Sequence, residues 1–164
     1  MMNTLTQSSP DHVEHTTLEF KGTPVGYTKP LTINKTWGHE LVHINTPRYC
    51  CKTLHINRGQ TTSCHFHINK HETMVVTEGI LYVRLYNTSL FSEESKSLFR
   101  QYEDFDVYAG DSFVIAPGMV HQLMCSWEDQ YVKFIECSTF SEDIDSHRIY
   151  ALGKNPYVAP RISP

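Results

Sequence analysis

Three histidines and one glutamate have the residue types and the spacing of a metal-binding set. His65 and His67 are two residues apart, Glu72 follows after a short interval, and His121 lies far downstream. Because residues i and i+2 of a strand leave the same face, one strand can present both imidazoles to one side. Imidazole nitrogens and a carboxylate oxygen suit Mn, Zn, Co, Ni or Fe without selecting sharply among them. The spacing therefore predicts one divalent metal with coordination positions left open for a substrate.

Turn-forming residues frame these four ligands. Gly59 precedes the first cluster and Gly79 follows it, while the segment Gly110–His121 carries Pro117-Gly118 just before its histidine. Glycine and proline at such positions mark tight turns between strands. An isolated His-x-His pair is common on strands and indicates a metal site only weakly. The pair together with the carboxylate and a second glycine-framed histidine is a far more specific indication of metal binding. We therefore expect two hairpins to bring the ligands together.

Short strands are the elements that must position these residues. Apolar and β-branched residues gather in runs at 40–44, 49–56, 61–68, 71–79, 80–86, 105–110, 111–116, 120–125 and 129–140. Turn signals separate the runs and helical periodicity is almost absent, which predicts an all-β sandwich or barrel. The polar segment 88–101 is interpreted as a long loop.

The length and the distribution of polar residues indicate one folded domain. A chain of 164 residues can bury a core of its own without disulfides or structural metals. We expect a polar N-terminal tail over 1–28, with an edge strand at 16–20. The barrel is expected over 29–148, followed by an extended, proline-rich tail over 149–164.

Charge, hydropathy and cysteine usage argue against several classes of partner. The net charge is −4 without a basic block, so we expect no nucleic acid to bind. No window reaches the ~18 apolar residues of a membrane helix, and the N-terminus lacks the order of a secretory signal. The five cysteines form no Cys-x-x-Cys pair. We interpret them as reduced, mostly buried residues of a cytoplasmic protein.

The two histidine segments resemble the sequence motifs of the cupins. The first motif, Gly-x5-His-x-His-x4-Glu-x6-Gly, is filled at Gly59, His65, His67, Glu72 and Gly79. The second, Gly-x5-Pro-x-Gly-x2-His, is met at Gly110, Gly118 and His121, with Ala116 where proline is usual and Pro117 beside it. The resemblance implies a single-domain jelly-roll barrel (a double-stranded β-helix) with the metal inside its mouth. Because exposed sheet edges of such folds are often covered by a partner, we also expect a homodimer.

Further features are similar to one group of cupins. A Trp-Gly turn at 37–38, the strand at 49–56 and an acidic exit at 142–148 occur in the order found in mannose-6-phosphate isomerase-like cupins and cupin D-lyxose isomerases. This similarity covers about 35–148. It implies aldose–ketose isomerisation of a sugar or sugar phosphate, in which a proton moves between C1 and C2 through a cis-enediolate. A divalent metal would stabilise that enediolate as a Lewis acid.

Three ionisable residues outside the metal set are candidates for the proton transfer and for substrate binding. Glu136 shares a strand face with large apolar residues, so we expect an inward-facing catalytic base whose pKa is raised by burial. Lys52 is also expected to face inward and to steady the enediolate or a phosphate, the alternative being a structural salt bridge. Arg148 suits a phosphate or sugar hydroxyl; its alternative is a surface ion pair with Asp143 or Asp145.

Two other functions are compatible with the same ligands. A non-haem Fe(II) cupin dioxygenase would use the metal for O2 chemistry, and an apolar wall expected from Leu123 and Cys125 beside His121 favours it. A non-catalytic sugar- or metabolite-binding cupin would bind a ligand without exchanging its C2 proton. A metal-independent nucleotide-sugar epimerase is disfavoured, because it would not need four intact metal ligands.

Overall fold

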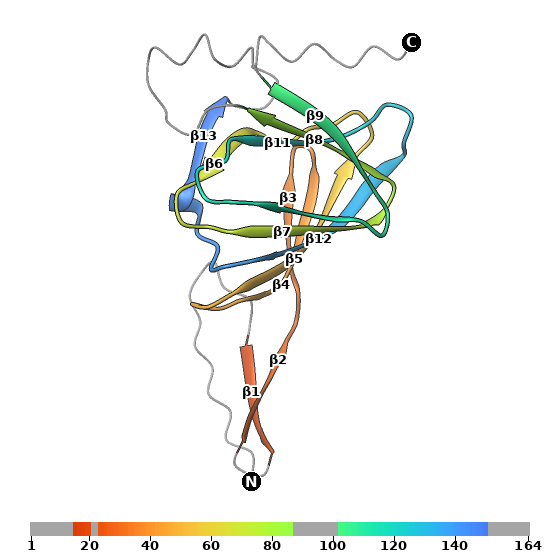
Figure 1. Cartoon of the computed structure of the whole chain (residues 1–164). Coiled ribbons are helices and arrows are strands. Elements are labelled where there is room, and N and C mark those ends of the chain that lie inside the picture. The colour runs from red at the N-terminus through yellow and green to blue at the C-terminus, as the bar shows by residue number, and fades with distance from the viewer. Residues whose placement is uncertain (1–14, 21–22, 87–101, 151–164) are drawn as a thin grey trace.

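Two antiparallel sheets form the barrel, as Figure 1 shows. The computed structural model describes the backbone of residues 15–20, 23–86 and 102–150. One sheet has the order β10-β7-β12-β5-β4-β3 and the other the order β13-β6-β11-β8-β9. The six-stranded sheet comprises β3 (Leu31–Lys35), β4 (Gly38–Asn45), β5 (Cys50–Asn57), β7 (Glu72–Glu78), β10 (Ser112–Ile115) and β12 (Tyr131–Ser138). The five-stranded sheet comprises β6 (Cys64–His67), β8 (Ile80–Tyr86), β9 (Tyr102–Tyr108), β11 (His121–Cys125) and β13 (Ser146–Tyr150).

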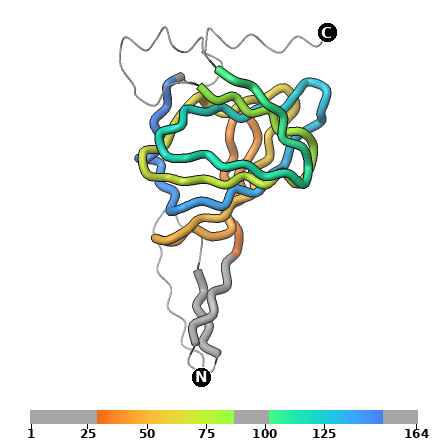
Figure 2. The backbone as a smooth tube through the Cα atoms, in the orientation of Figure 1, coloured from red at the N-terminus to blue at the C-terminus, as the bar shows by residue number. Residues whose placement is uncertain are grey.

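The apolar core fills the space between the two sheets. Its members alternate along the strands, so that β12 buries every second residue while those between them are half-buried or exposed. Both sheets contribute: Ile56 and Phe134 come from the six-stranded sheet, and Leu81, Val83 and Leu123 from the five-stranded sheet. In Figure 2 the coloured tube follows a closed outline around this core. The all-β, jelly-roll expectation is confirmed.

The elements outside the two sheets are few. Within the described ranges the helical structure is one short 3-10 turn, η2 (Asp143–Asp145), so no helix there has the length and apolarity needed to span a membrane. The strand expected at 16–20 is present as β1 (His15–Phe20), and it pairs with β2 (Thr23–Thr28) in a separate two-stranded sheet. The expected loop at 88–101 and the tail beyond 150 lie outside the described residues.

The metal-ligand segments meet where the chain crosses between the two sheets, and the expectation of two hairpins was wrong, because β6 and β7 lie in different sheets, as do β10 and β11. His121 on β11 is the register partner of His65 on β6, so the two histidine motifs meet in one sheet. The backbone N–H of Gly118, in the turn before β11, also donates to the carbonyl of His67 at 2.6 Å. At the far end of β7, Gly79 has φ +77, and a Cβ there would lie 2.7 Å from the Tyr131 carbonyl oxygen. Only glycine fits that turn.

Candidate metal centre

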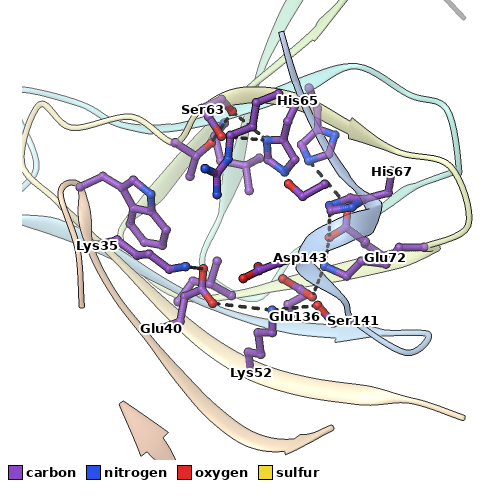
Figure 3. A pocket seen from close by; sticks show the side chains of 18 of the residues that line it. Lys35, Glu40, Lys52, Ser63, His65, His67, Glu72, Glu136, Ser141 and Asp143 are labelled. Carbon is purple, nitrogen blue, oxygen red and sulfur yellow. Dashed lines mark hydrogen bonds and ion pairs between the residues drawn. The ribbon is translucent and has the colours of Figure 1, made fainter. Parts of the chain in front are cut away.

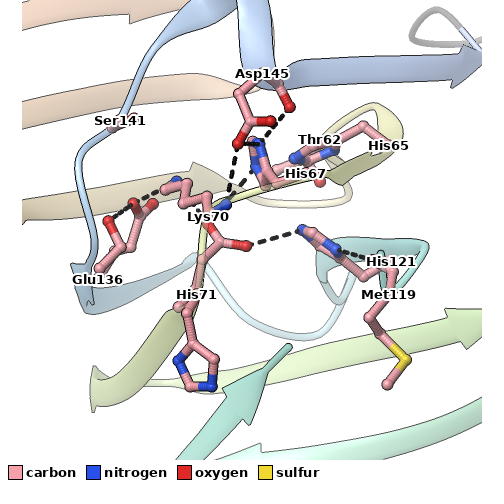
Figure 4. Close-up of polar contacts among 12 residues, drawn as sticks. Thr62, His65, His67, Lys70, His71, Met119, His121, Glu136, Ser141 and Asp145 are labelled. Atoms are coloured by element: carbon pink, nitrogen blue, oxygen red, sulfur yellow. Dashed lines mark hydrogen bonds and ion pairs between the residues drawn. The ribbon is translucent and has the colours of Figure 1, made fainter. Parts of the chain in front are cut away.

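The three predicted histidines converge at one point inside the barrel. One ring nitrogen of each of His65, His67 and His121 can be chosen so that all three lie within 4.8 Å of one another. The rings of His65 and His121 are in direct contact, with centroids 4.4 Å apart. Two strands of one sheet, β6 and β11, supply all three side chains. Figure 3 shows His65 and His67 on the wall of a pocket, and Figure 4 places His121 beside them.

Backbone carbonyls fix the orientation of each ring. Nδ1 of His65 contacts the Ser63 carbonyl at 2.8 Å, and Nδ1 of His121 contacts the Met119 carbonyl at 2.9 Å. Nδ1 of His67 contacts the Asp145 carbonyl at 3.0 Å. A carbonyl can only accept, so each Nδ1 carries the proton and each Nε2 keeps a free lone pair. This is the arrangement of metal-binding histidines, whose second nitrogen is held by a hydrogen bond.

The electrostatic environment keeps the histidines neutral. Burial, followed by the neighbouring His121, lowers the pKa of His65 to about 3. Burial also lowers the pKa of His121 to about 4, against an opposing hydrogen bond to the Met119 carbonyl. The pKa of His67 is lowered mainly by burial as well, although Glu72 partly opposes the shift. At neutral pH the lone pairs are therefore available to a cation, because a metal must displace no proton from them.

Glu72, the fourth predicted ligand, lies on β7 of the six-stranded sheet and faces the three histidines of the five-stranded sheet. Its side chain is 2% exposed; Oε1 lies 3.8 Å from Nε2 of His67, and Oε2 lies 3.7 Å from Nε2 of His121. Oε2 is buried and has no hydrogen-bond partner in the described part of the chain. A buried carboxylate oxygen without a partner is costly unless something else satisfies it. A divalent cation between the carboxylate and the three Nε2 atoms would do so, and the donor set therefore fits a metal.

Lys70 is a member of the site that sequence reasoning missed. Its side chain is 4% exposed, and Nζ lies 2.6 Å from Oε1 of Glu72 and 2.6 Å from Oε1 of Glu136. The ammonium group thus links a predicted metal ligand to the predicted catalytic base, and Figure 4 shows Lys70 beside Glu136. Burial lowers the Lys70 pKa, but Glu136 and Glu72 outweigh it and raise the pKa overall. A signal was available, because Lys70 and Glu72 are two residues apart.

Asp145 is a second residue whose role the sequence did not reveal. Its buried carboxylate accepts the backbone N–H groups of Ile68, Asn69 and Lys70 at 3.0–3.2 Å, which fixes the turn between β6 and β7. Its own carbonyl accepts the His67 Nδ1 hydrogen bond described above. Asp145 therefore orients a metal ligand and positions Lys70 without facing the metal itself.

Glu136 faces inward, as predicted, but its electrostatics are opposite to the expectation. The side chain is buried and lines the same pocket as the metal ligands. Burial raises the pKa of Glu136, but the ammonium groups of Lys70 and Lys52 outweigh burial and lower the pKa to about 2. Ser138 also donates to Oε1 at 3.0 Å. The expectation of a raised pKa was wrong, because it considered burial without the buried lysine beside the carboxylate.

Lys52 faces the pocket from β5. Its Nζ donates to the Ser141 hydroxyl at 3.1 Å and lies 3.6 Å from Oε2 of Glu40. Burial lowers the pKa of Lys52, while the Coulombic attraction of Glu136 and Glu40 raises it, and the net shift is upward. Figure 3 shows a line of alternating charges from Lys35 through Glu40 and Lys52 toward Glu136. Lys52 therefore has both features expected of it. It lines the pocket, as a substrate-binding residue would, and it forms an ion pair with Glu40, as a structural lysine would.

Arg148 lines the pocket and pairs with no carboxylate among the residues that the structure describes. It lies on β13, where it is the register partner of His65. It makes no ion pair within the described ranges, whereas Asp145, one of its two expected partners, is engaged with the turn after β6. The alternative of a surface ion pair with Asp143 or Asp145 is not what the structure shows. The guanidinium is exposed and faces solvent at the pocket.

The pocket combines this polar set with an apolar wall. Its volume is about 450 Å³, and Trp37, Leu54, Met74 and Leu123 supply apolar lining. Leu123 is placed as expected, but Cys125 packs in the core instead of lining the pocket, because it lies further along β11. A pocket of this size suits a small polar metabolite.

Comparison with known proteins identifies the fold. The model of the cupin family matches residues 32–148. No curated protein matches the chain significantly in sequence. Solved structures similar to it include the capsular polysaccharide assembling protein CapF from Staphylococcus aureus, with 18% identity, a TM-score of 0.61 and coverage of 75% of this chain. KdgF from Halomonas sp. has 16% identity and a TM-score of 0.54 over 70% of this chain and 91% of its own.

An oxalate decarboxylase from Lactobacillus farciminis is similar at 12% identity and a TM-score of 0.58, over 73% of this chain. The matched part covers 32% of the CapF chain and 34% of the decarboxylase chain, so this chain corresponds to about a third of each. At these identities the likeness concerns the fold alone, and the chemistry must be argued from the site.

Proposed function

The chain belongs to the cupin family, and from this premise we propose that it is a metal-dependent isomerase that interconverts the aldose and ketose forms of a sugar or sugar phosphate. The observation that carries the proposal is the shared pocket of the histidine cluster and Glu136. Glu72 and Glu136 both contact the ammonium group of Lys70, at 2.6 Å each. A substrate bound at the metal would therefore lie beside a second, independent carboxylate, as proton transfer between adjacent carbons requires.

The residues of this chain have separate roles in the proposed reaction. His65, His67, His121 and Glu72 would hold the metal, which when bound supplies Lewis acidity toward the substrate's carbonyl and adjacent hydroxyl oxygens. Glu136 would take the proton from C2 and return it at C1. The carboxylate is ionised over the whole neutral range, which is the form a base needs.

The low pKa of Glu136 also sets a requirement on the substrate complex. A carboxylate whose pKa is lowered by two nearby ammonium groups is a weak base, so at least one of these groups must move away from it when the substrate binds. Lys52 is the candidate, because its Nζ is in contact with Ser141 and Glu40 rather than fixed on Glu136. We expect Lys52 to turn toward an oxygen of the substrate, which raises the pKa of Glu136 and steadies the enediolate.

Three observations support a carbohydrate as substrate. The pocket presents hydrogen-bonding groups on several sides, namely Ser63, Ser141 and Asp143 together with the charged residues. Arg148 offers a guanidinium that pairs with no carboxylate of the described part of the chain, and its planar fork suits a phosphate or a pair of hydroxyl groups. CapF, which has a similar fold, is named for assembling a capsular polysaccharide. A sugar or sugar phosphate is the substrate class that uses all of these groups.

A second candidate is a non-haem Fe(II) dioxygenase. The apolar wall of Trp37, Met74 and Leu123 beside the histidines favours this function, because O2 chemistry benefits from a dry site. Such an enzyme would turn over only with ferrous iron and O2, and it would not depend on Glu136. The isomerase works without O2 and with redox-inactive metals.

Proton exchange distinguishes the candidates. Purified protein, loaded in turn with Mn²⁺, Co²⁺ and Zn²⁺, would be incubated without O2 in heavy water with a panel of aldoses and aldose phosphates. We expect deuterium to enter C2 of at least one substrate. Glu136→Gln should abolish the exchange while bound metal, measured by elemental analysis, is unchanged. Glu78→Gln, at an exposed carboxylate of β7, is the matched control and should retain full exchange. An absence of exchange with every sugar and metal would refute the isomerase.

A further inference from the structure

Two cysteines face each other across neighbouring strands on the outer side of the six-stranded sheet. Cys51 on β5 and Cys137 on β12 are direct register partners, so their side chains leave the same face of the sheet side by side. Register partners in antiparallel sheets have Cα atoms about 4.5 or 5.5 Å apart, and both values lie within the ~4.4–6.8 Å range of disulfides. The Cα separation of the pair is therefore within the range that a disulfide spans, although the Cβ atoms must still come closer.

The exposure of these residues separates them from the other three cysteines. Cys137 is exposed and Cys51 is half-buried, whereas Cys50, Cys64 and Cys125 are buried. Burial raises the pKa of the Cys64 thiol to about 12 and that of the Cys125 thiol to about 11, and it also raises the pKa of Cys51, so access to solvent is what distinguishes the pair at 51 and 137. Reaction with an oxidant requires both access and a thiolate. Among the five cysteines, only the pair at 51 and 137 combines access to solvent with a second cysteine as its register partner.

We propose that Cys51 and Cys137 form a reversible disulfide, which is a redox-sensitive modification site directly behind the pocket. The pair of residues next along the two strands is Lys52 and Glu136, which are also register partners and point to the inner face. Alternate residues of a strand leave opposite faces, so the sulfur atoms and the pocket charges lie on the two sides of the same two strands. This inference does not depend on the isomerase activity.

The reaction needs a hydroperoxide as oxidant. The Cys137 thiolate attacks one peroxide oxygen, forming an S–O bond and breaking the O–O bond, and the leaving hydroxide takes a proton to become water. The Cys51 thiolate then attacks the resulting sulfenic sulfur, forming the S–S bond and releasing the second oxygen as water. Two thiols are oxidised by two electrons in total, and hydrogen peroxide is reduced to two molecules of water. A dithiol reductant reverses the step by thiol–disulfide exchange.

Closing the disulfide would move the backbone behind the pocket. Cβ atoms of cross-strand partners are about 4.5–5.5 Å apart, while a disulfide requires about 3.5–4.5 Å. The two strands must therefore approach each other at this register, and Lys52 and Glu136 are carried with them. We expect the oxidised protein to differ from the reduced protein in the pocket as well as on the outer face.

Thiol counting tests the proposal with the full-length protein. The reduced protein would be treated with a small excess of hydrogen peroxide, denatured and titrated with a thiol reagent. Three of the five thiols should remain, the intact mass should fall by two hydrogen atoms, and digestion should release a linked peptide containing Cys51 and Cys137. Dithiothreitol should restore all five thiols.

Single substitutions provide the controls. In Cys51→Ser, Cys137 has no resolving thiol, so the linked peptide should disappear and the Cys137 sulfenic acid should be trapped by a dimedone probe. Cys125→Ser alters a buried cysteine of the core and should leave the linked peptide intact. Retention of all five thiols, a disulfide between two molecules, or direct conversion of Cys137 to sulfinic acid in the parent protein would each overturn the proposal.

Discussion

Replacing Lys70 with methionine removes a buried cation that contacts two buried carboxylates. Methionine keeps most of the side-chain volume but not the ammonium group, whose Nζ lies 2.6 Å from both Glu72 and Glu136. Breaking a buried ion pair from one side costs about 3–5 kcal/mol, because the remaining charge stays buried without its partner. For a chain of this size that corresponds to a fall in Tm of roughly 10 °C. The Glu136 pKa should also rise, since Lys70 is the strongest of the groups that lower it.

Metal should offset part of this loss. A cation bound by the histidines and Glu72 neutralises one of the two carboxylates that the substitution leaves unpaired. We therefore expect the rise in Tm on adding Mn²⁺ or Zn²⁺ to be larger for Lys70→Met than for the parent protein. Thermal unfolding followed by circular dichroism, with chelator and then with metal, measures both quantities.

A surface ion pair of the same length is the matched control. Lys133 Nζ lies 2.6 Å from Oε1 of Glu78, but both side chains are substantially exposed. Water can solvate the carboxylate that Lys133→Met leaves behind, so its Tm should stay close to that of the parent. If metal-free Lys70→Met melts like the parent or like Lys133→Met, the two carboxylates do not depend on the buried lysine and the reasoning is refuted.

Three further predictions concern the metal ligands and the turns. Asp145→Ala should weaken metal binding about 10–100-fold in an equilibrium titration, because His67 and its turn lose their support; unchanged affinity would contradict this role. Below pH ~6.5 the unfolded chain binds protons that His65 and His121 exclude in the fold. The stability of the metal-free protein should therefore be full above that pH and fall as pH drops toward about 4 and then 3; a flat stability profile over this range would contradict it. Gly79→Ala should lower Tm more than Gly118→Ala, since both have positive φ but only the first Cβ meets backbone; equal losses would contradict the clash.

The sequence was sufficient to predict which face of a strand each candidate side chain occupies. His65 and His67 lie two apart on one strand, and Lys52 and Glu136 were placed on inner faces by alternation alone. In each case the period of two that governs strands decides where the side chain points. The joint pattern of the two motifs then identified which strands had to meet.

Features that depend on contacts between distant segments could not be predicted. Asp145 orients His67 and the turn before Lys70 from about 75 residues away, and an aspartate in an acidic stretch gives no sign of this. The pKa of Glu136 was misjudged for the same reason, since its value depends on which charges approach it in space. The pairing of Cys51 with Cys137 likewise required the register of β5 and β12.

The position of β12 has a consequence for synthesis on the ribosome. This strand lies between β5 and β7, so the middle of the six-stranded sheet is occupied by a strand that follows all but one of the described strands in the chain. Until residues 131–138 have left the exit tunnel, β5 and β7 each lack a neighbour on one side, and their unpaired edges are open to association with other chains. The histidines of the first motif emerge long before the residues that orient and enclose them. A nascent chain should therefore gain protease resistance in one late step, when β12 and then β13 close the barrel.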